Sequence, residues 1–446
     1  MRRMTIVFGA LLAPASLAAQ LPDPATRALG MGGAYTAVAR GYEAVRWNPA
    51  LLAAGGRPGL SIGLPHVTME VGSNTYGFGD FRRYANRTLS DQDKQNLLNQ
   101  IAQDDSVLTV RTIGGVTPFA VQIGPFGFAA GTTGDVDFSL GRDAVELAFF
   151  GNAARSAAGQ FFTAAGSNAR GWAATTLAGS YAHRFRIPLG RLSVGATYKH
   201  ITGHFIARAL ETSSNFQVNP QFQVNAAGHA IFTNYSDSYN ASGLGDILGG
   251  EGNAGGGFGF DVGGVLELAG RRLTLSAVIV NALGSMSWDA DRLRYERAVY
   301  GVTQNADGSV TDDQTTTTLT TPQQIEADAT ARALRDDLLA NSDFSRYVRG
   351  GVTFRLAGFT FAGDGLLRLT DGLDRVPATQ LAGGAEYVLL GFLPLRAGLS
   401  TDFKNVGMSA GSGLRLFGVN LDASIANIEG SDRPGVIVGF GLGLIF

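Results

Sequence analysis

The sequence predicts an all-β fold class: a transmembrane antiparallel up-and-down β-barrel of about 14 strands, with an N-terminal hatch or plug segment and long extracellular loops containing short helices. Three observations predict it. Several segments alternate strictly between apolar and polar residues, and the connections between them alternate between short and long. The chain also contains 62 glycines among 446 residues, about twice the usual share of about 7%.

Composition excludes several other classes of protein. Glycine-rich sequence without a Gly-X-Y period is not collagen. A formal net charge of −2 without a basic block excludes a nucleic-acid partner, because nothing would neutralise the phosphates. The chain has no cysteine, which excludes disulfides and thiolate metal sites, and no residue pattern requires a cofactor or a metal.

Residues 1–19 are predicted to be a secretory signal peptide. Arg2 and Arg3 form a basic start, an apolar stretch follows over Ile6–Ala13, and Ser16–Ala19 supplies small residues for cleavage. Beyond this leader, no run approaches the ~18 apolar residues of a membrane-spanning helix.

Residues 20–57 are predicted to be a hatch inside the barrel lumen. Small residues near Gly30 allow close backbone packing, while Pro49 fixes φ and Asn48 bonds neighbouring backbone groups. Irregular backbone at membrane depth is tolerated only inside protein or a watery cavity, which favours the lumen. The alternative is an ordinary periplasmic N-terminal extension.

Residues 58–446 are predicted to form the barrel. From Arg191 the chain places Leu192 and Val194 on one face and Ser193 and Thr197 on the other. A sandwich would bury the apolar face, whereas a membrane barrel turns it to lipid, so the alternation alone does not decide between them.

Connection lengths decide in favour of the barrel. Short connections are expected at Thr117–Pro125, Ile187–Gly190, Ala269–Arg272, Ala357–Phe359, Gly391–Pro394 and Phe417–Gly418. Long ones are expected at Ser73–Ser106, Val136–Gly171, Ile206–Gly256 and Ser285–Arg346, with shorter members at Thr370–Ala378, Asp402–Gly407 and Asn427–Arg433. Short periplasmic turns alternating with long external loops are typical of an outer-membrane barrel, not of Greek-key crossovers.

The last strand carries a further signal. Over residues 435–446, every second residue is a larger apolar one, from Val436 to Phe446, and the residues between them are glycine or isoleucine. The strand ends on the aromatic Phe446. A terminal aromatic on an amphipathic strand is the feature that the barrel-assembly machinery is thought to recognise, which implies that partner. The alternative is a soluble strand that ends in phenylalanine.

The long loops contain two predicted helices and a set of candidate hydrophobic contacts. Ser90 and Asp93 form a capping pattern for a helix over 91–102, and Pro322 opens a second helix that reaches Leu338. One interpretation is that these helices form a lid or a docking surface at the extracellular mouth. The alternative is that they are loop material that folds back and packs on itself. Residues 311–321, beside the second helix, are expected to be mobile. The candidate loop contacts are Phe149, Phe150, Phe161 and Phe162, which alternatively anchor the rim at the lipid interface.

The segment over Leu29–Leu51 resembles the hatch of the FadL-like family of long-chain fatty-acid outer-membrane transporters. That hatch has a Leu-Gly-x-Gly-x-Ala core and a later Asn-Pro-Ala-Leu, which match Leu29–Ala34 and Asn48–Leu51 here. The resemblance therefore implies as candidate hatch residues Leu29, Gly30, Gly32, Ala34, Asn48, Pro49, Ala50 and Leu51. The hairpin containing Gly384–Tyr387 and Leu395–Gly398 is also similar to the family's closing strands. The remaining sequence matches in architecture only, which suits an uncharacterised branch of the superfamily.

The resemblance implies a function and its partners. The family takes up hydrophobic compounds such as long-chain fatty acids passively through a plugged barrel in the outer membrane of diderm bacteria. Expected partners are therefore outer-membrane lipid and lipopolysaccharide, and a hydrophobic small-molecule ligand. The alternative is a non-transporting barrel that serves as a scaffold or shuttle for protein secretion or surface attachment.

Lumen-facing charges are expected to form structural ion pairs in preference to a substrate site. They are Arg355, Asp364, Arg368, Glu386, Arg396, Arg415 and Asp422.

No catalytic residue is predicted, and the protein is not expected to be an enzyme. Gly59–Gly63 matches G-x-S-x-G, but the motif lies within an alternating strand and not at a strand–turn–helix elbow. His200 and His204 would stand roughly 13 Å apart on a strand, too far for a zinc pair. An outer-membrane hydrolase would need a serine with a histidine near it on one strand face, and no such pair is evident.

Overall fold

The computed structural model describes residues 25–103, 107–151, 161–217, 223–233, 253–340, 342–430 and 434–446. The predicted signal peptide, residues 1–19, lies outside the described residues. Within those described ranges, no helix is both long enough and apolar enough to cross a membrane.

Fourteen antiparallel strands close into a barrel, which confirms the predicted fold class. The first and last strands pair along their length, so the sheet has no open edge. In order around the barrel the strands are β1 (Leu60–Ser73), β2 (Val107–Ile123), β3 (Phe126–Gly141), β4 (Asn168–Ile187), β5 (Gly190–Gln217), β7 (Gly255–Leu268), β8 (Leu273–Trp288), β11 (Arg346–Leu356), β12 (Phe359–Thr370), β13 (Thr379–Leu389), β14 (Leu393–Thr401), β15 (Asn405–Leu416), β16 (Val419–Gly430) and β17 (Gly435–Ile445).

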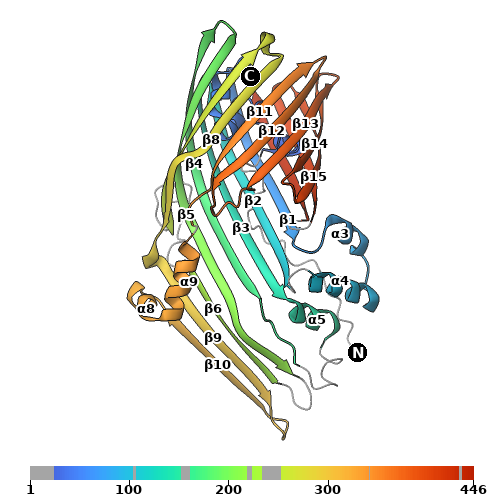
Figure 1. The fold of residues 1–446 in the computed structure, drawn as a ribbon, viewed down its shortest axis with the longest axis vertical. Helices are drawn as coiled ribbons and strands as arrows, with labels where there is room; N and C mark the ends of the chain where they lie inside the picture. The colour runs from blue at the N-terminus through green and yellow to red at the C-terminus, as the bar shows by residue number, and fades with distance from the viewer. Residues whose placement is uncertain are drawn as a thin grey trace.

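One end of the barrel carries only short turns, and we call it the short-turn end (Figure 1, top). Several are two-residue turns in which both residues have positive φ, as at Ala357 (50°) and Gly358 (87°) or Phe417 (52°) and Gly418 (83°). This backbone matches the twist of a hairpin and favours glycine at the second position. The turn predicted over Thr117–Pro125 is shorter than expected, because β2 continues to Ile123.

The barrel wall has the polarity of a membrane protein. On β5, Val194 and Tyr198 are 42% and 46% exposed on the outside, whereas Ser193 and Thr197 are 0% and 1% exposed facing inward. A soluble β-protein would show the opposite arrangement. An outer surface of this kind is stable in lipid and not in water, so the barrel spans a membrane.

The opposite end, which we call the long-connection end, is largely folded. Strand β5 continues beyond the barrel and pairs with β6 (Gln223–Thr233), which pairs with β9 (Leu293–Gln304), which pairs with β10 (Val310–Leu319). We call this sheet the extension (Figure 1). Much of the predicted loops Ile206–Gly256 and Ser285–Arg346 is therefore strand. Most of the segment 311–321, which was expected to be mobile, lies in β10, which forms a full ladder with β9.

Helices flank this end of the molecule (Figure 1). The helix predicted over 91–102 is confirmed as α4 (Asp91–Gln103), and hydrogen bonds from the Ser90 hydroxyl and backbone hold the pKa of Asp93 below its usual range. The helix predicted from Pro322 is two helices, α8 (Pro322–Ala327) and α9 (Ala329–Leu339), because Asp328 is extended and caps the second. Helices α3 (Phe78–Tyr84) and α5 (Arg142–Phe150) were not predicted.

Residues 25–57, which we call the N-terminal segment, lie inside the barrel. They form short helical turns: α1 (Thr26–Gly30), η1 (Gly41–Glu43), α2 (Ala44–Trp47) and η2 (Pro49–Ala53). From Ala25 to Ala54 every residue is buried except Arg27, Arg40, Glu43 and Arg46, which are half-buried. The apolar side chains of the segment pack on one another and on small wall residues such as Ala120, Ala129 and Ala178. The segment thus plugs the lumen.

Candidate functional site

Glycines on the inner wall let the N-terminal segment approach the strands backbone to backbone. A Cβ atom on Gly398 would collide with the backbone of Met31 and Gly32, and one on Gly195 would stand 2.6 Å from the nitrogen of Ala50. Gly32 has a φ of 66°, and a Cβ there would lie 2.7 Å from the carbonyl oxygen of Leu399. Glycine alone satisfies both the conformation and the space. The glycine content of the chain therefore has a structural cause at this contact.

Asn48 and Pro49 fix the last turn of the segment against the wall. The Asn48 side chain is fully buried and accepts a hydrogen bond from the Ala50 N–H at 3.0 Å, which caps η2. Its amide nitrogen donates to the carbonyl oxygens of Gly264 on β7 and Ala277 on β8, at 3.4 and 3.3 Å. One side chain thus orders the segment and attaches it to two strands.

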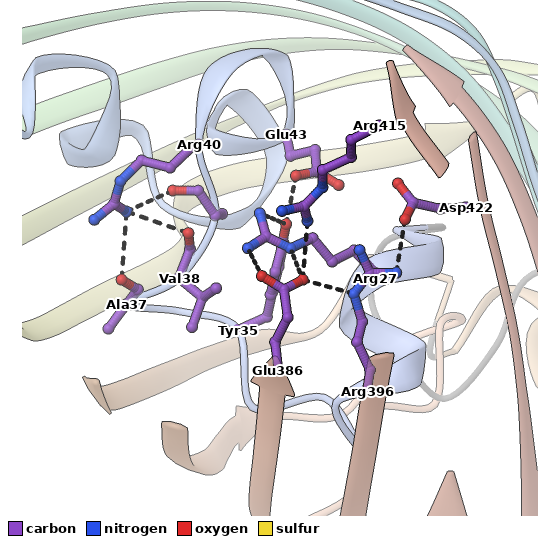
Figure 2. Close-up of polar contacts among 11 residues, drawn as sticks. Arg27, Tyr35, Ala37, Val38, Arg40, Glu43, Glu386, Arg396, Arg415 and Asp422 are labelled. Carbon is purple, nitrogen blue, oxygen red and sulfur yellow. Dashed lines mark hydrogen bonds and ion pairs between the residues drawn. The ribbon is translucent and has the colours of Figure 1, made fainter. Parts of the chain in front are cut away.

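A charge cluster, formed by Arg27, Glu386, Arg396, Arg415 and Asp422, joins the segment to the opposite part of the wall (Figure 2). Glu386 accepts hydrogen bonds from Arg27 and Arg396, both at 2.7 Å, and from Arg415 at 3.0 Å. Arg396 also contacts Asp422 at 2.6 Å, and its side chain is completely buried. Glu386 and Arg396 face each other directly across the β13–β14 ladder. Charge-assisted hydrogen bonds of this kind are strong and directional.

Aromatic rings of the segment extend this network. The Tyr35 hydroxyl donates to Glu43 within the segment (Figure 2), and the Arg27 guanidinium lies 5.5 Å from the Tyr35 ring. Arg349 on β11 stacks 4.3 Å from the Trp47 ring and donates to the Trp47 carbonyl oxygen at 3.0 Å. The wall therefore holds aromatic residues of the segment through cations as well as through apolar contact.

Wall carboxylates bind backbone N–H groups of the segment directly. Asp364 on β12 accepts from the N–H groups of Tyr35 at 2.9 Å and Thr36 at 2.7 Å, and Glu267 on β7 accepts from Gly55 at 2.8 Å. Arg40 stabilises the turn between these points by donating to three consecutive carbonyl oxygens of the segment, those of residues 37–39 (Figure 2). Backbone that has no sheet partner is thereby satisfied by side chains.

A small cavity lies between the segment and strands β11–β13. It is lined by Gly33, Trp47, Arg349, Asp364 and Leu366, and it has room for about one water molecule. A chain-like apolar ligand does not fit there. Passage of such a ligand through this level of the lumen requires the segment to move.

The structure distributes the predicted residues as follows. All eight candidate hatch residues are buried in the lumen. Phe149 and Phe150 pack in the cluster between α4 and α5, whereas Phe162 is 2% exposed and bonds to Phe216, and Phe161 is 43% exposed. The four phenylalanines therefore do not form one exposed patch. Phe446 completes the closure, because its backbone bonds to Gly59 and Leu60.

The expected lumen ion pairs are present around Glu386, but their partner Arg27 was not identified from the sequence. Tyr35, Glu43, Glu267 and Arg349 were also missed. The available signal was the presence of single charged residues in a segment otherwise made of small and apolar ones. Arg355 and Arg368 lie apart from the cluster, since they bond to the carbonyl oxygens of Arg271 and Val376.

The rejected motifs have structural roles. Ser61, in the G-x-S-x-G match, lies on β1, accepts from the Tyr42 N–H at 2.8 Å and donates to Gln122 at 3.1 Å. His204 bonds to Thr175 at 2.7 Å. Among the described residues, no group of three or more metal-binding side chains could hold an ion.

Comparison with solved structures finds channels of similar architecture. The chain is similar to a Pseudomonas aeruginosa FadL homologue (11% identity, TM-score 0.48, covering 97% of this chain and 100% of that one). It is also similar to the P. putida toluene transporter TodX (11%, 0.47, 94% and 97%) and the Ralstonia pickettii toluene transporter TbuX (10%, 0.46, 96% and 99%).

No curated protein matches the sequence. A family of unknown function, DUF5723, matches residues 49–353, from the Asn-Pro-Ala-Leu turn of the segment to β11. This match covers more than half of the chain, so the protein belongs to the DUF5723 family.

Proposed function

We propose that the protein is an outer-membrane channel for the passive uptake of hydrophobic compounds such as long-chain fatty acids, with the N-terminal segment as its hatch. In this orientation the short-turn end faces the periplasm and the long-connection end faces the cell exterior. The signal peptide, outer-membrane lipid, lipopolysaccharide and the barrel-assembly machinery are parts of the same proposal.

The observation that carries the proposal is how the lumen is closed. The segment fills it, and Glu386, Asp364, Glu267 and Arg349 of the wall bond to it through non-covalent polar contacts. These polar contacts can exchange with water when the segment shifts, and its apolar contacts are made with small wall residues such as Ala120 and Ala129. The resemblance of Leu29–Ala34 and Asn48–Leu51 to a hatch motif supports the same function.

In the proposed mechanism, the protein supplies a route and no chemistry. An apolar compound cannot cross the polysaccharide layer outside, so it enters at the long-connection end and moves down its concentration gradient. The compound passes when the segment rearranges, which breaks the contacts of Arg27 and Asn48 with the wall. Water can replace these contacts at a net cost of about 0.5–1.5 kcal/mol for each neutral hydrogen bond of Asn48 and about 1.5–3 kcal/mol for each bond between the charged Arg27 and Glu386 groups.

The alternative function is a scaffold or shuttle for protein secretion or surface attachment. One observation favours it: the extension and the α8–α9 pair project from the long-connection end, where a protein partner could dock (Figure 1). The N-terminal segment would then be a permanent plug.

Native mass spectrometry of the detergent-extracted barrel distinguishes the two functions, once heat-modifiability on a gel shows that the barrel is folded. Uptake predicts a co-purified fatty acid or other apolar molecule that is lost in the variant with Asn48→Ala and Pro49→Ala. The matched control is Asn427→Ala on β16, which bonds only to the exposed Glu429 side chain in the described contacts. An empty barrel that retains a protein partner contradicts uptake and supports the scaffold.

A further inference from the structure

The connection between β12 and β13, residues 371–378, crosses the lumen. We call it the crossing loop. It leaves the wall at Thr370 and returns at Thr379, yet its Arg375 pairs with Asp135, at 3.6 Å, and with Asp137, both on β3. Strands β4, β5, β7, β8 and β11 separate β3 from β12 along one arc of the barrel, and the other arc is longer. A contact between these strands therefore spans the lumen.

The crossing loop is anchored along its length. The Trp172 indole on β4 donates to the Leu373 carbonyl oxygen at 3.0 Å, and the Leu373 N–H donates to the Asp343 carbonyl oxygen at 2.8 Å. Asp374 accepts from the Ser345 N–H at 2.8 Å. Leu373 and Val376 are 9% and 2% exposed. A surface loop would not bury its apolar residues or bond to the far wall.

Arg375 holds the tip of the crossing loop in a costly conformation. Its φ is 43°, in the left-handed region that a side-chain-bearing residue rarely occupies. Such a conformation persists only where surrounding contacts impose it. Here the contacts are the two carboxylates of β3, which Arg375 reaches from across the lumen.

Asp137 keeps other partners when Arg375 is absent. Asp137 also bonds to Arg111 on β2 at 2.8 Å and contacts Arg170 on β4 at 3.6 Å. These two arginines lie on the wall beside β3 and do not belong to the loop. Removing the Arg375 side chain therefore frees the loop from β3 without leaving Asp137 unpaired, while the contacts of Leu373 and Asp374 remain.

The crossing loop lies on the long-connection side of the N-terminal segment. Val376 packs with Val278, Tyr347 and Leu366 in a buried cluster, and Leu366 also lines the water-sized cavity against Trp47 of the segment. The order from the long-connection end is therefore crossing loop, small cavity, N-terminal segment. Two unconnected parts of the chain therefore lie across the lumen at successive levels.

We propose that the crossing loop is a second gate of the channel, with Arg375 as its latch to Asp135 and Asp137. The gating role rests on the uptake function proposed above, whereas the closure itself does not. A compound entering from outside meets this gate first, and the latch must open before the compound reaches the segment. Opening separates Arg375 from the two carboxylates, and Asp137 keeps Arg111 and Arg170 as partners.

Cysteine labelling tests the closure in the full-length protein, which has no natural cysteine. Ala382 on β13 lines the cavity between the two obstructions. In intact cells, a bulky membrane-impermeant maleimide should label Ala382→Cys slowly, and at least about tenfold faster when Arg375→Ala is added, since the loop has then lost its attachment to β3 and opens more often. Trp172→Phe, which removes the donor to Leu373 without changing charge, should also accelerate labelling.

The matched control is Arg170→Ala, which removes the same charge from the same carboxylate but leaves the loop attached. It should leave the labelling rate unchanged. The proposal would be overturned if Ala382→Cys were labelled at the same rate alone, with Arg375→Ala and with Trp172→Phe, in barrels shown to be folded by heat-modifiability. Labelling reports access and not transport. If labelling accelerates but the barrel carries no apolar ligand, the closure by the crossing loop is supported and the uptake function is contradicted. If the barrel takes up ligand but labelling is unchanged, uptake is supported and the closure is contradicted.

Discussion

At the scale of single residues, the position of the N-terminal segment in the lumen depends on contacts that no local sequence pattern encodes. Arg27 and Glu386 are 359 positions apart, and their pairing follows only from closing the barrel around the segment. The sequence did identify Glu386, Arg396 and Asp422 as inward-facing charges, because strand alternation assigns each residue to a face. It could not identify their partners, since the segment has no regular period.

Gly398 offers a direct test of the backbone contact. In Gly398→Ala, the added methyl would collide with Met31 and Gly32, so we expect the free energy of unfolding to fall by about 1–3 kcal/mol, or the segment to detach and become accessible to protease. Urea unfolding in detergent micelles and limited proteolysis measure the two effects. Gly383→Ala is the matched control, because nothing lies within 4 Å of the Cβ position of Gly383. A Gly398→Ala variant as stable and protected as the control would show that the contact is not close.

Glu386 tests the charge cluster. Glu386→Gln keeps the shape but removes the negative charge with which Arg27, Arg396 and Arg415 all pair. Breaking a buried pair in this way costs about 3–5 kcal/mol, and we expect trypsin to cleave after Arg27 much faster than in the parent. The control is Glu429→Gln on β16, whose carboxylate bonds to Asn427 at an exposed site. Unchanged cleavage in Glu386→Gln would mean that the cluster does not hold the segment.

At the scale of elements, strands with one apolar face were predictable, whereas strands with two polar faces were not. The segment 310–319 contains Asp, Gln and Thr without alternation and is exposed on both faces, yet it forms β10 through its ladder with β9. Its stability comes from a partner in space, which sequence periodicity does not report. The same holds for β6, which pairs with the extended part of β5.

The break between α8 and α9 gives a prediction at this scale. Asp328 accepts from the N–H groups of Thr330 and Ala331, both at 2.9 Å, and thereby starts α9. Asp328→Ala should destabilise α9 by about 0.5–2 kcal/mol, seen as faster amide hydrogen exchange over residues 329–335. Gln323→Ala, at an exposed position of α8, should not change exchange there. If exchange in α9 is equal in the two variants, packing of Leu334 and Leu338 sets its stability, and the cap does not.

At the scale of the whole molecule, the rhythm of connections and the amphipathic strands were sufficient to predict a closed barrel with a plug. The strand number was also predictable, because the extension strands lie outside the barrel and do not change the closure. The crossing loop was predicted only as a connection over Thr370–Ala378. Its path across the lumen depends on Arg375 reaching Asp137 on the opposite wall, a contact with no sequence signature.

The central claim is that the N-terminal segment must move for an apolar molecule to pass. Arg46 of the segment donates to Thr117 on β2 at 2.8 Å, so cysteines at these positions can be joined by a short bifunctional thiol reagent in a chain that has no other cysteine. Uptake of a labelled long-chain fatty acid by cells should fall to background after cross-linking of the Arg46→Cys, Thr117→Cys variant. Each single-cysteine variant treated in the same way should retain uptake. Undiminished uptake through a fully cross-linked barrel would contradict the claim.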